Sequence, residues 1–297
     1  MLANTMMTEV GSSLNAFTVD LEDWFQGLTS TNPQVNRWPL FESRVVPATL
    51  RLLEILRTYR IQATFFVLGH VADCHPTLVD AIQTDGHEIA VHGYWHCYVS
   101  RLTPAEFSLE LERSVKAIMP ITGQMPVGHR APYFSVNRTT PWVFEILRGH
   151  GFLYDSSVFP IRNGFYGYHG APRFPYIPSG AGLVEFPLST VRLGGINWPI
   201  AGGFYLRLWP YGFVRWAIRQ LNRQGQPAIL YLHPWELDLD QPYHPVTPRE
   251  RITHYAGRRR LAPKLHRLFS EFRFEPLRTL LGREWHSQPE SGSYDHH

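Results

Sequence analysis

Residues 16–23 read AFTVDLED, and this stretch decides how the chain is expected to fold. A short run of β-prone apolar residues ends at Asp20 and is followed at once by Glu22 and Asp23. Later runs are also short and mainly apolar, namely 62–68 (QATFFVL), 88–92 (EIAVH), 127–130 (VGHR), 152–155 (FLYD) and 228–233 (AILYLH). Runs of this kind predict strands that are buried in a parallel sheet.

Helix-like segments separate these strands. The clearest begins at Thr103, which with Glu106 has the spacing of a capping box. Further helices are predicted after Pro47 (with Leu50, Leu53 and Leu56 on one face), over 76–84, after Pro141 and over 210–224. The alternation predicts an α/β fold with a parallel, closed or nearly closed (β/α) barrel. Between Phe159 and Tyr205 the alternation fails, and this Gly-, Pro- and aromatic-rich stretch is interpreted as an insertion.

Composition and length limit the domain organisation. Of the 297 residues, 44% are hydrophobic, which excludes a mostly disordered chain, and only 18% are charged, which argues against a coiled coil. The sequence has no internal repeat and no evident interdomain linker, and its length suits one large α/β domain. We expect an N-terminal tail over 1–15, one catalytic domain over 16–280, and a disordered tail over 281–297.

Charge and cysteine content narrow the class of partner. A net charge of +3 is too small a surplus to predict nucleic-acid binding. Two cysteines cannot build a disulfide framework, and the first residues show neither a signal peptide nor a membrane-spanning run. We therefore expect a cytoplasmic protein. A contact with the membrane surface through Arg258–Arg260 stays open, although a solvated cluster is the commoner explanation of such a run.

Ionisable residues stand at the carboxyl ends of the predicted strands. They are Asp20, His92, Arg130, Asp155 and His233, and His96 follows four residues after His92. In (β/α) barrels the carboxyl ends of the strands meet at one rim, where active sites lie. Each residue alone has a commoner structural explanation, such as a solvated turn or an ordinary ion pair. Their joint placement predicts an active site.

The order of these motifs resembles a known family. FTVDLEDW, HGYWH, RAPYF and ILYLH follow the sequence of signature motifs in polysaccharide deacetylases of the NodB-homology type, carbohydrate esterase family four. The resemblance runs from about Ala16 to Glu236. VDLEDWF, YDSS, GGFYLRLWPY and HPWELD are similar to the exosortase-associated branch, which occurs with exopolysaccharide gene clusters. The resemblance implies a distorted (β/α) barrel of about seven strands, of the NodB-homology type.

It also implies a divalent metal site, with zinc as the expected ion. His92 and His96 match the family's histidine ligands, and the third ligand is an acid of the first motif. Here the chain departs from the commonest pattern, because Leu21 follows Asp20 and cannot bind metal. Strand alternation places Glu22 on the same face as Asp20, whereas Asp23 keeps the usual residue type. Asp23 is preferred as the ligand, and Glu22 is kept open.

The remaining roles follow from the same resemblance. Asp20 matches the general base and Arg130 the arginine that pairs with it. His233 matches the general acid, with Asp155 as the residue that orients it. The backbone N–H of Tyr133 is the implied oxyanion donor.

The last expectations concern two tryptophans near the site and the reaction that the protein catalyses. Trp95 and Trp235 flank site residues, and they either stack on sugar rings or pack in the core. We expect a metal-dependent hydrolase that removes N-acetyl groups from an amino sugar in an exopolysaccharide or its lipid-linked precursor, so the partner is an N-acetylated oligo- or polysaccharide. The alternatives are an allantoinase-like hydrolase of a non-sugar amide and a non-catalytic carbohydrate-binding protein with a structural metal. The presence of both Asp20 and His233 favours the sugar substrate.

Overall fold

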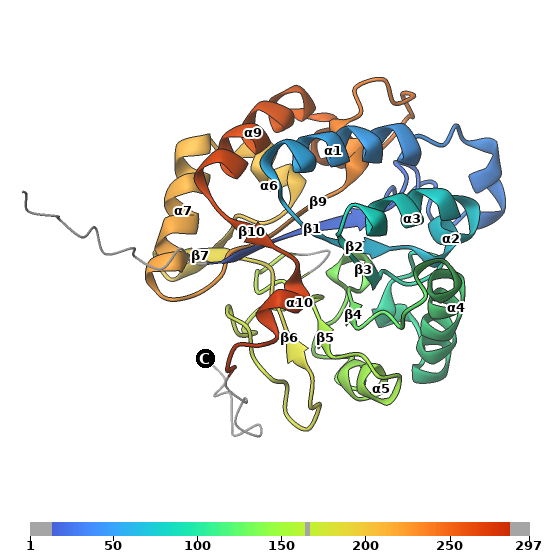
Figure 1. Ribbon diagram of the computed structural model, residues 1–297, viewed down its shortest axis with the longest axis horizontal. Coiled ribbons are helices and arrows are strands. Elements are labelled where there is room, and N and C mark those ends of the chain that lie inside the picture. The colour runs from blue at the N-terminus through green and yellow to red at the C-terminus, as the bar shows by residue number, and fades with distance from the viewer. Residues whose placement is uncertain (1–13, 164–166, 286–297) are drawn as a thin grey trace, which may run out of the picture.

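A curled parallel sheet forms the centre of the molecule (Figure 1). The computed structural model describes residues 14–163 and 167–285, so residues 1–13 and 286–297 of the two predicted tails lie outside the described residues. The strands of the sheet are β1 (Asn15–Leu21), β2 (Thr64–Val67), β3 (Glu88–Val91), β4 (Gly128–His129), β5 (Tyr154–Asp155), β6 (Val184–Glu185), β9 (Ile229–Leu232) and β10 (Phe274–Glu275).

Strand β1 lies between two partners, with β2 on one side and β9 on the other. Thr18 pairs with Thr64 of β2, and Ala16 pairs with Ile229 of β9. The order β9-β1-β2-β3-β4-β5-β6 then continues in parallel, and β10 pairs with the first residues of β1. Beyond β6, the backbone N–H of Ser189 donates to the carbonyl of Ile229 (3.3 Å), which brings this segment back to β9. The predicted α/β barrel is confirmed.

Helices cover the outer side of the sheet. They are α1 (Val45–Tyr59), α2 (Gly69–Cys74), α3 (Pro76–Thr84), α4 (Pro104–Thr122), α5 (Val143–Gly149), α6 (Gly203–Leu208), α7 (Tyr211–Arg223), α8 (Pro248–Glu250), α9 (Leu261–Glu271) and α10 (Leu277–Leu280). Figure 1 shows α1 and α9 side by side, although they come from opposite ends of the chain, and the two helices are in contact.

Two helix predictions can be compared directly with the structure. The capping box of α4 is present, with the Thr103 hydroxyl accepting from Glu106 N–H (3.3 Å) and the Glu106 carboxylate accepting from Thr103 N–H (2.8 Å). In α1 the predicted apolar face is partly wrong. Leu53 and Leu56 are buried, but Leu50 is 47% exposed, because a spacing of three residues rotates each position by about 60° and carries Leu50 outside the buried stripe.

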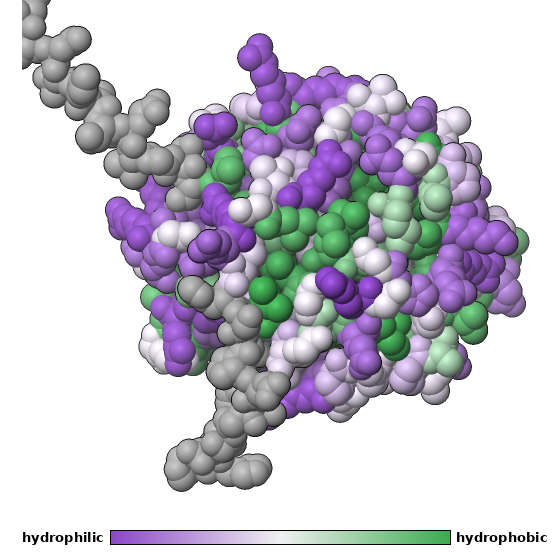
Figure 2. Space-filling model, turned by 60° about the horizontal axis from the view of Figure 1, so that its bottom comes forward, coloured by the Kyte–Doolittle hydropathy of each residue, from purple (hydrophilic) through white to green (hydrophobic). Residues whose placement is uncertain are grey.

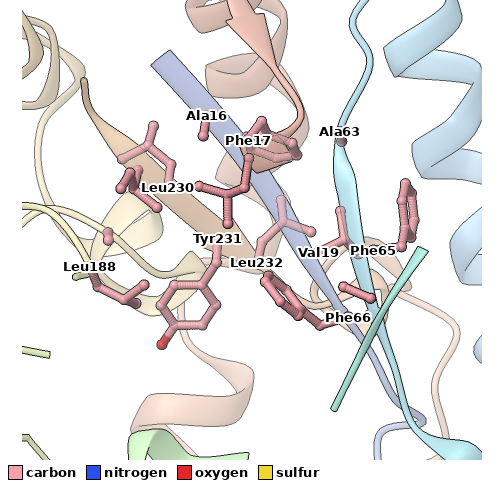
Figure 3. Close-up of a cluster of buried hydrophobic side chains, with 14 of the residues drawn as sticks. Ala16, Phe17, Val19, Ala63, Phe65, Phe66, Leu188, Leu230, Tyr231 and Leu232 are labelled. Carbon is pink, nitrogen blue, oxygen red and sulfur yellow. The ribbon is translucent and has the colours of Figure 1, made fainter. Parts of the chain in front are cut away.

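The core is built on both faces of the sheet. Phe17 and Val19 of β1 pack among apolar side chains of β2 and β9 (Figure 3). The ring of Phe17 also meets that of Phe269 in α9 edge-on, at 4.9 Å between centroids. Thr18 and Asp20 alternate with them and point to the opposite face, where both accept hydrogen bonds from a buried arginine. Strand alternation thus separates the core side chains of β1 from its site side chains.

The stretch predicted as an insertion contains more regular structure than expected. It supplies β6 to the barrel, and it continues into an antiparallel hairpin of β7 (Thr190–Leu193) and β8 (Ile196–Pro199). The two-residue length of β6 is too short for a periodic signal, which explains why the sequence pattern did not show it. Helix α9 and strand β10, after Leu239, were also not predicted.

Apolar residues reach the surface as well. Figure 2 shows one face of the molecule, on which hydrophobic residues gather near the middle with hydrophilic residues around them. Within residues 14–163 and 167–285, none of the helices combines the length and the apolar character that crossing a bilayer requires.

Candidate active site

Side chains from the carboxyl ends of the strands meet in one cavity of about 490 Å³. Its floor carries sequence-predicted residues, namely Asp20, Glu22, His92, His96, Tyr133, His233 and Trp235. Its walls come from three later or neighbouring segments, which contribute residues within 27–29, 203–207 and 247–254. The barrel therefore brings the predicted groups together, as its topology requires.

Three of these residues form a candidate metal site. One ligand atom each of Glu22, His92 and His96 lies within 4.8 Å of the others, and all three side chains are buried. Glu22 Oε2 is 2.7 Å from His96 Nε2, yet it accepts no well-aligned hydrogen bond. Two imidazoles and one carboxylate are the donor set of open catalytic zinc sites. The residues present therefore fit a divalent cation.

Hydrogen bonding, burial and neighbouring charges keep His92 neutral and Glu22 ionised, which are the forms that bind a metal ion. Nδ1 of His92 lies 2.8 Å from the carbonyl of Arg130, so it carries the proton and Nε2 faces the cluster. Burial lowers the pKa of His92 to about 4, which keeps the ring neutral. Burial raises the pKa of Glu22, but the charges of His96 and His233 outweigh it and hold this pKa well below its usual range.

Asp23 lies outside this cluster, which corrects the sequence preference for it as the acidic ligand. Its carboxylate accepts from the backbone N–H of Arg44 (3.0 Å) and Val45 (3.3 Å) at the start of α1, and from the hydroxyl of Ser43 (2.6 Å). The carboxylate thus satisfies free N–H groups of a helix N-terminus. Burial raises its pKa to about 6, against the opposing effect of these hydrogen bonds. The structure places Glu22 in the cluster instead.

Asp20 is held by Arg130 inside the barrel. Nη1 of Arg130 donates to Asp20 Oδ1 (2.6 Å) and to the hydroxyl of Thr18 (2.7 Å), while its other nitrogens donate to the carbonyl and hydroxyl of Ser156. The second oxygen of Asp20 lies 4.0 Å from His92 Nε2 and 3.9 Å from His233 Nε2. The predicted Asp20–Arg130 pair is thus present in the structure, next to the candidate metal site.

His233 follows β9 and faces the same point. Its Nε2 is 3.5 Å from Glu22 Oε1, and its Nδ1 is 3.0 Å from Oε1 of Glu236. Burial lowers the pKa of His233, but the carboxylates of Glu22, Glu236 and Asp20 outweigh it and raise the pKa to about 9.

Asp155 does not contact His233, contrary to the role expected for it. Its Oδ1 accepts from the hydroxyl of Ser157 (2.6 Å) and lies 2.7 Å from His129 Nδ1. Glu185 lies next to Asp155, and burial followed by the charge of Asp155 raises the pKa of Glu185 well above its usual range. Asp155 therefore belongs to a buried polar network beneath the site.

Neither of the tryptophans predicted to stack on sugar rings presents a free ring face to the cavity. The ring of Trp235 is stacked between those of His233 (5.0 Å) and His254 (4.1 Å), and its indole N–H donates to Glu22 Oε1 (3.2 Å). Trp95 does not line the cavity and packs against Trp38. Trp235 therefore has both faces occupied, and Trp95, which is partly exposed, lies outside the cavity.

Tyr133 lies in a strained turn at the cavity. His96, Tyr133 and Phe134 have φ angles of 54°, 57° and 49°, a region that non-glycine residues rarely adopt. The Tyr133 ring meets that of His96 edge-on at 4.4 Å and stacks on Tyr98 at 4.0 Å. Backbone strain of this kind gathers at functional sites, and these positions lie beside the candidate metal site.

Two functional neighbours of the site escaped the sequence analysis, Glu236 and Arg207. Glu236 follows His233 by three residues, and this capping-box spacing could have drawn attention to it. Arg207 lies in GGFYLRLWPY, a stretch quoted for the resemblance, but no spacing there indicated its role. Arg258, from the predicted basic cluster, donates to the carbonyls of Trp235 and Asp238 and supports the rim of the site.

Two family models match the chain. The model described as polysaccharide deacetylase matches residues 33–152, and a model described as a domain of unknown function matches residues 156–282. This pairing is typical of deacetylases associated with exopolysaccharides. A peptidoglycan deacetylase of Helicobacter pylori is 34% identical over 119 residues, which are 40% of this chain and 39% of that protein. A chitooligosaccharide deacetylase of Bradyrhizobium is 37% identical over 83 residues, 28% of this chain and 38% of that protein.

The chain therefore spans well under half the length of these curated relatives. Among solved structures, a polysaccharide deacetylase homologue from Mycobacterium smegmatis has a TM-score of 0.59 at 23% identity, over 91% of this chain and 90% of that one. A variant, with restored activity, of a carbohydrate esterase family four pseudoenzyme from Bacillus anthracis has a TM-score of 0.50 at 15% identity, over 94% and 70%. These likenesses concern the fold. The family model shows that the chain carries a polysaccharide deacetylase domain over residues 33–152, and the likeness in fold extends over most of the chain.

Proposed function

We propose that the protein is a metal-dependent deacetylase that hydrolyses the N-acetyl group of an amino sugar in an exopolysaccharide or its lipid-linked precursor. One observation carries this proposal. A candidate metal site of Glu22, His92 and His96 lies in one cavity with the Asp20 carboxylate on one side and His233 on another. Amide hydrolysis requires a base, an acid and a Lewis acid around a single carbonyl.

In this proposal the metal ligands, the base and the acid are different residues. Glu22, His92 and His96 would hold the cation, which when bound polarises the acetyl carbonyl and makes a water molecule more acidic. The Asp20 carboxylate accepts the proton that this water loses as its oxygen bonds to the carbonyl carbon. Nε2 of His233 gives a proton to the amine nitrogen as the C–N bond breaks. Acetic acid, which ionises to acetate, and a free amino sugar leave. Transfer of the proton from Asp20 to His233 through solvent then returns both residues to their starting states.

Arg130 keeps the base effective. Its guanidinium binds one oxygen of Asp20 at 2.6 Å and leaves the second free to accept a proton. The backbone N–H of Tyr133 stays a predicted donor to the developing oxyanion.

The substrate class rests on the relatives. Peptidoglycan deacetylase and chitooligosaccharide deacetylase are the names of proteins with related segments, and both names denote N-acetylated saccharides. The second segment, 156–282, supports an exopolysaccharide, since its pairing with the first is typical of deacetylases associated with such polymers.

Acetate release tests the proposal. The full chain, loaded with Zn²⁺, is incubated with a panel of N-acetylated oligosaccharides and with a non-sugar N-acetyl amide, before and after chelation and with Zn²⁺ restored. We expect acetate from the saccharides, its loss with chelator and its return with metal. A fully loaded protein that releases no acetate from any of the saccharides would contradict the proposal, and binding of the same saccharides without release would favour the non-catalytic alternative. Release only from the non-sugar amide would also contradict the proposal.

A further inference from the structure

We propose that Glu236, held in place by Arg207, is the positioning residue for His233, and that the segment 156–282 thereby completes the active site. The inference rests on the proposed function, in which His233 is the general acid. It assigns a task to residues that match a domain of unknown function.

Glu236 binds His233 at two points. Its Oε1 lies 3.0 Å from Nδ1 of the ring and accepts from the backbone N–H of the same residue at 3.1 Å. A ring whose Nδ1–H donates to a carboxylate is fixed in orientation, and its Nε2 is directed away from that carboxylate. Here Nε2 faces Asp20 and Glu22 across the cavity.

Arg207 holds the other oxygen of Glu236. Its Nε donates to Oε2 at 2.8 Å, and both side chains are 1% exposed. Arg207 also donates to the carbonyls of Thr253 (2.6 Å), His254 (3.3 Å) and Ala256. One buried guanidinium thus joins α6, the residue that binds His233, and the segment that forms the far wall of the cavity.

The backbone of α6 leaves room for this arrangement only because residue 203 is glycine. A Cβ placed on Gly203 would overlap both carboxylate oxygens of Glu236. The carboxylate is therefore packed directly against the first turn of α6. This close approach gives Glu236 one position, which is what a positioning residue needs.

The stack around Trp235 restrains the ring of His233 from its face. The rings of His233 and Trp235 are 5.0 Å apart and nearly parallel, at 16°, and His254 covers the opposite face of Trp235. Glu236 fixes rotation of the imidazole in its own plane, and Trp235 limits its tilt. Asp155, the expected orienting residue, is bound to His129 and Ser157.

The variant Glu236→Gln tests the positioning role, because it removes the acceptor for His233 and keeps the volume of the side chain. A carboxylate accepts on both oxygens, one for Arg207 and one for His233, whereas an amide has a single acceptor oxygen. Arg207 has only donors, so the amide oxygen turns to it and the NH₂ group faces Nδ1 of His233. The ring then loses its acceptor while the volume of the side chain is unchanged.

The kinetic test compares an N-acetylated oligosaccharide with an activated acetate ester, whose leaving group needs little protonation. For Glu236→Gln we expect kcat on the amide to fall roughly 10- to 100-fold, as for other residues that orient a functional group, with KM changed less than about threefold. Loss on the ester should be below about threefold. Glu236→Asp, which keeps both acceptors, should recover part of the amide rate. The matched control is Glu271→Gln, which breaks an arginine pair at the surface.

Equal losses on both substrates would overturn the proposal, and so would an amide-selective loss in Asp155→Asn with none in Glu236→Gln. If Glu236→Gln fails to fold, ¹⁵N NMR spectra of the histidines in the zinc-loaded wild-type protein test the proposal instead. The signals of His233 are assigned by comparison with His233→Ala. We expect a protonated Nδ1 on His233, and an unprotonated Nδ1 would overturn the proposal. This readout does not need turnover, so it stands even if the protein releases no acetate and the proposed function fails.

Discussion

Nη1 of Arg130 donates to Oδ1 of Asp20 at 2.6 Å inside the barrel, where the two side chains are 0% and 2% exposed. The pair links β1 to the segment after β4, and the same guanidinium binds Ser156 after β5. A buried pair of this kind costs desolvation to form, but the loss of one partner leaves a buried charge without compensation.

Arg130→Met should therefore lower the free energy of unfolding by about 3–5 kcal/mol. Urea denaturation measures this change. The double variant Arg130→Met/Asp20→Asn should recover part of the loss, because it removes the stranded carboxylate. Arg215→Met, which breaks the surface pair with Glu271, is the control and should cost less than about 1 kcal/mol. A cost for Arg130→Met no larger than that of the control would contradict the assignment.

Metal content separates the two acids of the first motif. Glu22→Gln should remove most bound zinc, because a site with three protein ligands loses a third of its donors. Asp23→Asn should keep its zinc and instead lose about 0.5–2 kcal/mol of stability, since the amide retains one acceptor oxygen and loses the other acceptor and the negative charge at the start of α1. Elemental analysis and urea denaturation of both variants test this. Full zinc in Glu22→Gln, or an empty Asp23→Asn, would reverse the assignment.

Asp20→Asn should abolish most turnover while zinc stays bound. The amide cannot accept the proton that water loses, and general bases contribute about 10²- to 10⁴-fold to rates. Acetate release per bound zinc is the quantity to measure. A variant that keeps wild-type turnover would show that another group is the base, and loss of zinc in this variant would place Asp20 among the ligands.

Stability should fall in mild acid because of His87, which precedes β3 and is far from the cavity. Its Nδ1 accepts from Ala63 N–H (3.1 Å), and burial lowers its pKa from 6.5 to about 4. Between these pH values the unfolded chain binds a proton that the native protein does not, so the free energy of unfolding falls as pH decreases through this window. The contribution is at most about 3 kcal/mol.

His87→Asn keeps an acceptor for Ala63 and removes the titration. The free energy of unfolding of this variant should depend less steeply on pH between 6.5 and 4 than that of the wild type, when both are measured by urea denaturation. Parallel curves for the two proteins would contradict the assignment.

Sequence patterns predicted the features that depend on local order. The run around Asp20 became the central strand, and alternation correctly placed Glu22 on the face of Asp20, as both line the cavity. The Thr103 capping box began a helix where expected. Alternation alone would have selected Glu22 over Asp23, and it was the residue type usual in the family that pointed to Asp23.

What the sequence patterns missed depends on contacts between distant segments. Asp23 is occupied by the start of α1, some twenty residues later in the chain. Glu236 acquires its position from Arg207, and Asp155 is bound by His129. A residue that takes its partner from another loop carries no periodic signal, so its role becomes visible only once the tertiary contacts are known.

The central place of β1 in the sheet affects how the protein folds during translation. Ala16 pairs with Ile229 and Asn15 with Phe274, so the strand is synthesised more than 200 residues before these two partners. Until then its apolar edge has only β2 as a neighbour, and closing so large a loop is slow. Until these partners emerge, nascent chains are open to edge-to-edge association, so a lower growth temperature and added chaperones should raise the yield of folded protein.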